Sequence, residues 1–276
     1  PLQQRRESHP RTQNSKTPRP LRTPTRLSKM LNLLRKSLQA TLARFGMELR
    51  SKSLHEQADD PYNALFHLMP EQEALIIIDA GASIGQTSAK LAHLYPQATI
   101  HAIEPHLPFF EQVQSVANEN PRIRPHKFAL SNYDGTASLH INQSEGSNSL
   151  LPTSSQRQDP YGDLLDTSKE IEVRTQTLDT FLEHHRIERV DILKLDLQGS
   201  ELPALKGASK ALERGTIRAI LCEVLFVESY ESQPNPSTLL HHLSDFHSFV
   251  VFNLYQPHFH HGRLIQADVL LLHSDF

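Results

Sequence analysis

An acidic residue stands where the first strongly strand-like segment ends in a glycine turn. The stretch LIIIDAGASIGQTSAKL, residues 75–91, runs from aliphatic residues through Asp79 into the turn and then a helix-like segment. A strand, a glycine turn and a helix start together form a site for anions such as phosphate. The dinucleotide spacing G-x-G-x-x-G fails, however, because Ser83 and Gln86 occupy the second and third glycine positions counted from Gly81. A carboxylate facing a pyrophosphate would also cost about 1–4 kcal/mol, so a cationic ligand is favoured here.

A second acid ends the next strand-like segment, TIHAIEPH, 25 residues after the first. Glu104 occupies a position at which a carboxylate can accept both hydroxyls of a ribose. Each acid alone has an ordinary alternative, Asp79 as a helix cap and Glu104 as a solvated loop residue. Together they favour a ligand with a ribose and a positive charge but no phosphate. S-adenosylmethionine has these groups: adenosine, a sulfonium, an α-ammonium and a single carboxylate.

Strand-like and helix-compatible segments alternate from residue 75 onward. This alternation predicts parallel βαβ units in a doubly wound sheet, where ligands bind at the carboxyl ends of the strands. The last two strand-like segments are joined only by QPHFHHGRLIQ, which is too short and polar for a helix, so they are expected to form an antiparallel hairpin. The expected strands are 75–80, 99–104, 123–130, 190–196, 217–224, 249–254 and 267–272, and the expected helices are 86–95, 108–119, 201–213 and 237–246.

Successive motifs of the chain resemble those of the FkbM family of S-adenosylmethionine-dependent methyltransferases. In order they are IIIDAGASIGQTS, IHAIEPH, KFALSNYDGTASLHI, EGSNSLLP, RTQTLDTFL and, as the most specific, VDILKLDLQGSELPALKGA. They span residues 75 to about 224, and the C-terminal part is compatible with the family. The resemblance implies an α/β, Rossmann-like class I methyltransferase fold, with a doubly wound, mostly parallel seven-stranded sheet and an antiparallel C-terminal hairpin.

Two positions depart from the family pattern. Gln198 stands where the family more often has Glu, which keeps the hydrogen-bonding shape, loses a charge and argues against a direct catalytic role there. Ser83 stands where Asn or Gly is usual, a small change that preserves the turn.

The resemblance also assigns residues to the cofactor site. Ala129 and Leu130 are expected to border the adenine, with backbone groups reading the edge of the base, and Asp196 is expected to point toward the methyl donor. The implied cofactor-binding residues are Asp79, Gly81, Ala82, Ser83, Gly85, Glu104, Pro105, Ala129, Leu130 and Asp196.

Three acids are candidates for handling the methyl acceptor. Methyl transfer to oxygen requires alignment of acceptor, methyl group and sulfur, and a group that removes the hydroxyl proton. Asp196 ends the fourth expected strand and Glu201 begins the next helix, so these two are the first candidates, with Glu223 as the third. Lys194 shares a strand face with Asp196, so a purely structural ion pair is the alternative. The sequence does not choose among the three acids.

The N-terminal part differs in composition from the rest of the chain. Residues 1–29 carry eight Lys and Arg against one acid, and they are expected to be a disordered basic extension. Such a segment also suits a transit peptide or an anionic-surface tether, but an extension ahead of a natural start at Met30 is favoured. Residues 30–70 are expected to form a helical appendage whose apolar stripe docks on the domain or, alternatively, contacts a membrane surface. Residues 71–276 are the expected methyltransferase domain.

The composition argues against several other classes of protein. A single cysteine, Cys222, excludes an internal disulfide and a zinc ribbon and favours a reducing, cytoplasmic location. Outside residues 1–29, 20 basic residues face 30 acidic ones, so no nucleic-acid partner is expected. The cluster His258, His260 and His261, near Asp268, lacks a second group with ligand spacing, so exposed loop histidines and no metal are expected.

The sequence therefore predicts an enzyme that methylates a hydroxyl of a small molecule or sugar with S-adenosylmethionine. The polar stretch 142–170 is expected to be a lid on the acceptor side. One alternative is a non-catalytic module that binds S-adenosylmethionine or another nucleoside. A nucleotide-dependent oxidoreductase ranks third because the dinucleotide glycine spacing is absent. The sequence leaves the oligomeric state and the identity of the acceptor open.

Overall fold

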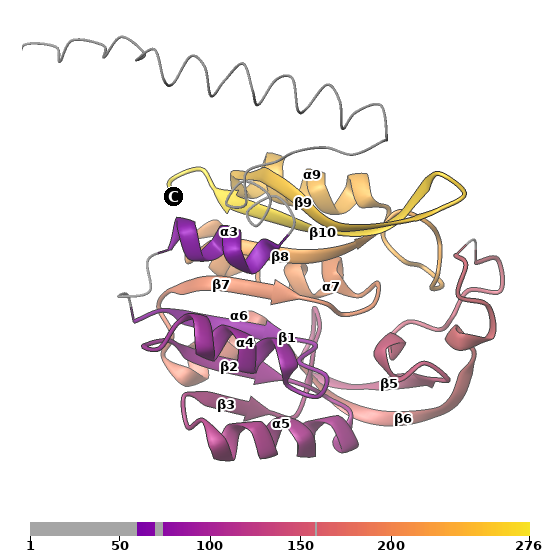
Figure 1. Ribbon diagram of the computed structural model, residues 1–276, viewed down its shortest axis with the longest axis horizontal. Helices are drawn as coiled ribbons and strands as arrows, with labels where there is room; N and C mark the ends of the chain where they lie inside the picture. The colour runs from indigo at the N-terminus through magenta and orange to yellow at the C-terminus, as the bar shows by residue number, and fades with distance from the viewer. Residues whose placement is uncertain (1–59, 70–73, 158) are drawn as a thin grey trace, which may run out of the picture. The chain divides into compact units, whose positions relative to one another are not determined.

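A seven-stranded β-sheet forms the centre of the domain (Figure 1). The computed structural model describes residues 60–69, 74–157 and 159–276. The strand order is β3-β2-β1-β7-β8-β10-β9, with neighbours parallel from β3 to β8 and β10 antiparallel to both of its neighbours. This arrangement confirms the predicted fold class. The strands are β1 Ile76–Ala80, β2 Thr99–Ile103, β3 Ile123–His126, β7 Val190–Leu195, β8 Ile217–Leu225, β9 Phe249–His260 and β10 Arg263–His273.

Strands β9 and β10 form the predicted antiparallel hairpin, but both are longer than expected. The residues between them are His261 and Gly262, whose φ angles of 48° and 77° are both positive. A two-residue turn of this kind matches the twist of paired strands, so the strands continue right up to it. The prediction that His258 and His260 belong to a loop is therefore wrong, since both lie on β9, where they are exposed.

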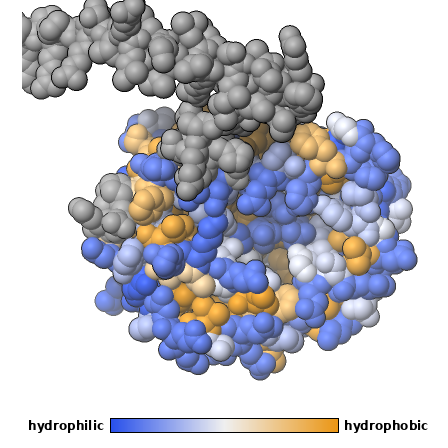
Figure 2. Space-filling view, viewed as in Figure 1, coloured by the Kyte–Doolittle hydropathy of each residue, from blue (hydrophilic) through white to orange (hydrophobic). Residues whose placement is uncertain are grey.

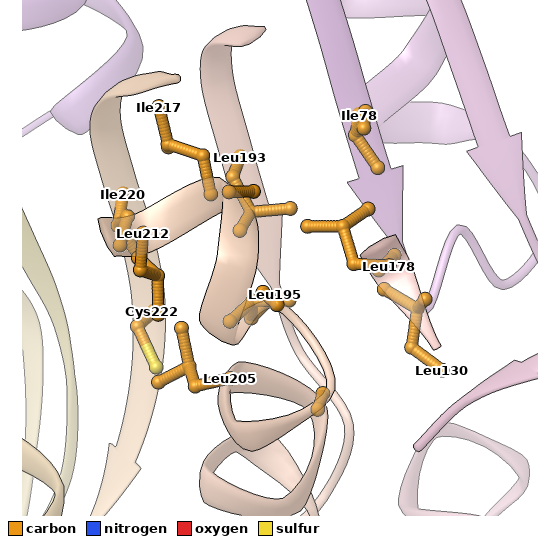
Figure 3. Close-up of a cluster of buried hydrophobic side chains, with 14 of the residues drawn as sticks. Ile78, Leu130, Leu178, Leu193, Leu195, Leu205, Leu212, Ile217, Ile220 and Cys222 are labelled. Carbon is orange, nitrogen blue, oxygen red and sulfur yellow. The ribbon is translucent and has the colours of Figure 1, made fainter. Parts of the chain in front are cut away.

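Helices pack on both faces of the sheet and bury two apolar clusters. Side chains alternate along β1, so Ile78 joins one cluster and Ile77 the other. Figure 3 shows part of the first cluster, with Leu205 and Leu212 among the labelled side chains. Hydrophilic residues dominate the face in Figure 2. Helices α6 Leu178–His185, α7 Glu201–Lys206, α8 Ser209–Glu213 and α9 Pro236–His247 contribute to the first cluster, and α3 Pro61–Leu68, α4 Gln86–Leu94 and α5 Leu107–Glu119 to the second.

The helix predicted over 201–213 is two helices, α7 and α8, separated at Gly207. The amide of Asp179, on α6, donates to the Gly207 carbonyl at 3.0 Å. The Asp179 carboxylate in turn accepts from the amides of Lys210 and Ala211 in the first turn of α8, each at 2.9 Å. Because α6 supplies these partners, tertiary contacts rather than helix propensity decide where α7 ends.

A second sheet, which the sequence analysis does not predict, has the order β4-β6-β5. The strand expected over 123–130 is divided between the two sheets, because Ala129 and Leu130 pair with β6 instead of continuing β3. The stretch 142–170 contains the start of β6 and two short 3-10 helices. These elements are β4 Ala129–Leu130, β5 Gly135–Asn142, η1 Glu145–Ser147, η2 Gly162–Leu165 and β6 Thr167–Gln176.

Most of the N-terminal predictions lie outside the described residues. Of the expected appendage, the structure describes residues 60–69, where Ala64 and Leu65 of α3 pack into the same cluster as Ile77. The division into three regions therefore stays a prediction. Within the described ranges, every helix is too short or too polar to cross a membrane.

Replacing Gly207 by Ala is expected to lower the free energy of unfolding by about 1–3 kcal/mol, the usual cost of overpacking. A Cβ at this position would lie 2.1 Å from the carbonyl oxygen of Ser131, a backbone atom that cannot swing aside. Gly146→Ala is the matched control, since its Cβ would meet nothing within 4 Å and should change stability by less than about 0.5 kcal/mol. Urea unfolding measures both variants, and equal losses would contradict the close approach at Gly207.

Candidate active site

Two cavities open at the carboxyl ends of the central strands, and Asp196, which follows β7, lines both. The first has a volume of about 650 Å³ and is bordered by the ends of β1, β2 and β7 and by β4. The second, of about 820 Å³, is bordered by β7, β8, β9, β10 and the N-terminal turn of α3. Ligands of open α/β sheets bind at this edge. The topology thus gathers residues that are far apart in the sequence.

The glycine turn after β1 presses the backbone of Gly81 against that of Asp196. Gly81 has a φ of +73°, and a Cβ there would lie 1.9 Å from the Asp196 carbonyl oxygen, so only glycine fits. The Gly81 amide donates to the Ile103 carbonyl at 3.1 Å, and the Gly81 carbonyl accepts from Lys194 Nζ at 2.9 Å. The turn therefore joins the ends of three strands and presents its backbone to the first cavity.

Asp79 is fully buried and does not line either cavity. Its Oδ2 accepts from Ser88 Oγ at 2.6 Å, and its Oδ1 lies 3.2 Å from Lys194 Nζ. Burial alone would lower the pKa of Lys194, but the carboxylates of Asp79 and Asp196 outweigh burial and raise that pKa, which keeps the ammonium charged. The sequence analysis expected the Asp79 carboxylate to face a cationic ligand, but it faces the internal cation Lys194. Lys194 in turn donates to the carbonyl of Gly81, which lines the first cavity.

Glu104 lines the first cavity, and each of its oxygens is bonded to one backbone amide. Oε2 accepts from the Ser83 amide and Oε1 from the His106 amide, both at 2.9 Å. Each carboxylate oxygen has two acceptor positions, so both oxygens can take a further hydrogen bond from a ligand hydroxyl. Burial raises the pKa of Glu104 to about 7, against the opposing effect of the two amides. This arrangement suits a ribose with two adjacent hydroxyls.

Apolar side chains form much of the remaining wall of the first cavity. Such walls suit the faces of a nucleobase, which is flat and only weakly polar over its rings. They are Ile103, Phe109, Phe128, Leu130, Leu139 and Leu150.

The segment 142–170, predicted as a lid on the acceptor side, borders the first cavity and contacts a lining residue of the second. Glu145 and Asn148 line the first cavity. The hydroxyl of Tyr161 donates to Gln266 Oε1 at 2.7 Å, and Gln266 lines the second cavity. A lid function agrees with this position and stays a prediction.

Gln198 bridges two of the three predicted catalytic acids. Its amide nitrogen donates to Asp196 Oδ1 at 2.9 Å and to Glu223 Oε2 at 2.7 Å. Its oxygen accepts from the Tyr230 hydroxyl at 3.0 Å. Burial, followed by the charges of Asp196 and Glu201, raises the pKa of Glu223 well above its usual range. A Glu at position 198 would have no N–H donors for this bridge, so the departure from the family pattern has a structural consequence.

Glu201 supports the loop that carries Asp196. Its Oε1 accepts from the amides of Leu197 at 2.8 Å and Gly199 at 3.3 Å, and the side chain lines neither of the two cavities described above. Burial raises the pKa of Glu201 to about 7. The structure therefore places Glu201 as a loop-holding residue, away from the position expected of a group that contacts an acceptor.

The second cavity contains residues that the sequence motifs do not connect. Asp268 on β10 lies directly opposite Glu223 on β8 in the antiparallel register. Burial and the charge of Asp196 raise the pKa of Asp268 to about 6. The amide of Gln266 donates to Glu223 Oε1 at 3.2 Å. No sequence signal marks Gln266, and the pairing of β10 with β8 is what brings Asp268 here.

The structure groups most, but not all, of the predicted site residues. Asp79, Ala82 and Gly85 do not line the first cavity, and Glu223 lines the second. No set of three or more His, Cys, Asp or Glu side chains suited to a metal ion occurs within the described part of the chain. The predicted cofactor-binding residues that do line the first cavity are Gly81, Ser83, Glu104, Pro105, Ala129, Leu130 and Asp196.

Two known proteins similar to this chain in sequence are named as methyltransferases. Methyltransferase 1 of Beauveria bassiana (strain ARSEF 2860) is 28% identical over 153 residues, which cover 51% of this chain and 61% of that protein, so the match spans about three fifths of the relative's length. The 2-O-methyltransferase NoeI of Sinorhizobium fredii (strain NBRC 101917 / NGR234) is 24% identical over 201 residues, which cover 71% of this chain and 78% of that protein. A crystal structure of Aeropyrum pernix fibrillarin with natively bound S-adenosyl-L-methionine is similar at a TM-score of 0.43 and 14% identity, covering 76% of this chain and 73% of that one.

The family model described as "Methyltransferase FkbM domain" matches residues 79–259, which is more than half of the chain. This range includes the glycine turn, Glu104, the Asp196 loop and Glu223. The chain therefore belongs to the family of FkbM-domain methyltransferases, whose methyl donor is S-adenosylmethionine.

Proposed function

We propose that this protein transfers a methyl group from S-adenosylmethionine to a hydroxyl oxygen of a small molecule or sugar. The observation that carries the proposal is the pair of cavities meeting at Asp196, one suited to a nucleoside and the other polar and lined by acids. The similar protein NoeI is named as a 2-O-methyltransferase, which supports oxygen as the methylated atom. The second cavity then holds the acceptor next to the donor.

The first cavity fits the methyl donor by its own chemistry. Glu104 would accept the two ribose hydroxyls, and the apolar walls around Phe128 would enclose the adenine. The backbone at Gly81, where no Cβ can be placed, would lie along the methionine part. Asp79 would act indirectly: its ion pair fixes Lys194, and Lys194 fixes the Gly81 carbonyl by a hydrogen bond.

Residues at the boundary of the two cavities would handle the acceptor. S-adenosylmethionine supplies an electrophilic methyl group on a sulfonium, so the sulfur–carbon bond breaks as an oxygen–carbon bond forms. Asp196 would orient the acceptor hydroxyl, and Glu223 would take its proton, because a carboxylate with a raised pKa is the stronger base. Gln198 would fix the positions of the two carboxylates relative to each other, because its amide nitrogen donates to both.

Methyl transfer to a panel of hydroxylated compounds tests the proposal. The purified full chain is incubated with isotopically labelled S-adenosylmethionine and a metabolite extract, and labelled products are identified by mass spectrometry. Labelled methyl ethers are expected. Tight binding of the methyl donor without transfer to any compound would instead support the non-catalytic binding module.

Glu104→Gln is expected to weaken binding of S-adenosylmethionine and S-adenosylhomocysteine by similar factors of roughly tenfold or more, because both carry the ribose and charge-assisted hydrogen bonds contribute about 1.5–3 kcal/mol. In the wild type, affinity should fall as the pH drops through about 7, where Glu104 takes up a proton and loses an acceptor position. The variant should lack this part of the pH dependence. Calorimetric titration at several pH values measures both effects, and undiminished affinity of the variant would remove Glu104 from the site.

Asp79→Asn is expected to destabilise the fold by about 3–5 kcal/mol, because it removes a carboxylate from a buried ion pair and leaves Lys194 undercompensated. Affinity for S-adenosylmethionine should fall as well, since the Gly81 carbonyl loses its fixed donor. Lys90→Gln is the matched control: it breaks the solvent-accessible pair of Lys90 with Asp60 and should cost less than about 1 kcal/mol. Chemical denaturation separates the two cases, and a small loss in Asp79→Asn would contradict the importance of the buried pair.

Gln198→Glu is expected to move the acidic limb of the pH–rate profile to higher pH by about one unit, because a further carboxylate next to Glu223 raises its pKa more. The kcat at neutral pH should fall roughly tenfold with the loss of the amide bridge. Gln112→Glu adds the same charge at an exposed position on α5 and serves as the control. The profile is measured with an acceptor found in the panel, and an unshifted limb would assign proton removal to another group.

A further inference from the structure

The second cavity brings together more acidic groups than its own basic residues pair with. Lys194 lies 3.2 Å from Asp79 and 3.6 Å from Asp196 and donates to the Gly81 carbonyl, so its charge is already shared by two carboxylates. Glu223 accepts hydrogen bonds only from neutral amides, those of Gln198 and Gln266, among the residues that the structure describes. Asp268 forms no ion pair with any described residue, although Lys194 and His258 are near enough to act on its charge.

Glu223 and Asp268, which form no ion pair with the residues described, lie on adjacent strands. Asp268 and Glu223 are directly opposite in the antiparallel pairing of β10 with β8, and both line the second cavity. Like charges at such paired positions are destabilising. The register of β10 with β9 shifts between Gln266 and Asp268, an irregularity of the kind that re-aims side chains beside active sites. The strands thus hold two acidic side chains, which repel each other when both are ionised, side by side at a cavity that a ligand can enter.

The rest of the lining is suited to hydroxyl groups. Gln256, His258 and Gln266 offer amide and imidazole groups that both donate and accept hydrogen bonds. Tyr62 of α3 also lines the cavity. A polyhydroxylated ligand can use all of these groups, whereas an anionic ligand would be repelled by the two carboxylates.

We propose that the second cavity selects a polyhydroxylated acceptor that carries a protonated amino group, as an amino sugar or amino alcohol does, and that Asp268 and Glu223 bind this group. Asp268 is then a specificity-determining residue, because its carboxylate lies farther from the donor cavity than Asp196, which lines both. The ammonium offsets the repulsion between the two acids. This inference rests on the proposed function, since it assigns the cavity to the methyl acceptor.

Three matched probes test the inference without requiring the natural acceptor. D-glucosamine, N-acetyl-D-glucosamine and D-glucose are titrated at neutral pH into the full chain saturated with S-adenosylhomocysteine, and binding is followed by ligand-observed NMR. The wild type should bind glucosamine at least roughly tenfold more tightly than the other two probes, which lack the cation. Asp268→Asn, which preserves the shape of the side chain, should reduce the preference to about twofold or less. Asp275→Asn removes a charge beyond the opposite end of β10 and should leave the preference intact.

Each outcome decides the inference. Equal binding of the three probes, no detectable binding of glucosamine at millimolar concentration, or an unchanged preference in Asp268→Asn would overturn it. Thermal unfolding of both variants checks that they are folded. If Asp268→Asn is not folded, Glu223→Gln provides a second variant, with the same expected loss of the preference for glucosamine. Binding of S-adenosylhomocysteine is measured separately. If this product binds but the amine preference is absent, only the inference fails, whereas failure of the product to bind would also overturn the proposed function.

Discussion

The site depends on one buried ammonium group, that of Lys194. Lys194 and Asp79 are register partners in the parallel pair β7 and β1, so their side chains meet at the carboxyl edge of the sheet. The ammonium joins the Asp79 carboxylate, the Gly81 carbonyl and Asp196. A buried cation is costly unless it is paired and hydrogen-bonded, and here three oxygens from two strand ends satisfy it. The position of the glycine turn relative to Asp196 follows from this contact.

Charge is distributed unevenly around that ammonium. The carboxylate of Asp79 is paired with Lys194. In the second cavity Glu223 accepts hydrogen bonds from neutral amides, and neither Glu223 nor Asp268 forms an ion pair with a residue that the structure describes. Burial raises the pKa of each of these two acids, as it raises that of Glu104. Carboxylates with raised pKa values cluster where a ligand or a proton is exchanged. Glu104 in the first cavity and Glu223 and Asp268 in the second are therefore candidates for groups that meet a ligand or exchange a proton.

The loop after β7 connects the two sides of the site. Gln198 adopts a φ of +52°, which is unusual outside glycine. The Glu201 carboxylate accepts from the Leu197 amide of this loop, and the Tyr230 hydroxyl, from the segment after β8, donates to the Gln198 side chain. Ser149, from the segment after β5, also donates to the Gln198 carbonyl at 2.7 Å. The second sheet and its connecting segment thus stabilise the backbone that carries Asp196. This gives the unpredicted sheet a role in positioning the site.

Local patterns in the sequence determined much of this protein. Apolar runs, the glycine turn and the acids at strand ends were enough to predict the parallel sheet, the C-terminal hairpin and the donor pocket around Glu104. These features depend on residues close together in the chain, where periodicity and turn chemistry act. Long-range contacts decided the rest: the split of 123–130 between two sheets, the break at Gly207, the pairing of Asp79 with Lys194, and the Asp268–Glu223 pair. None of these is encoded in a local pattern, because each depends on which strands and helices become neighbours and in what register.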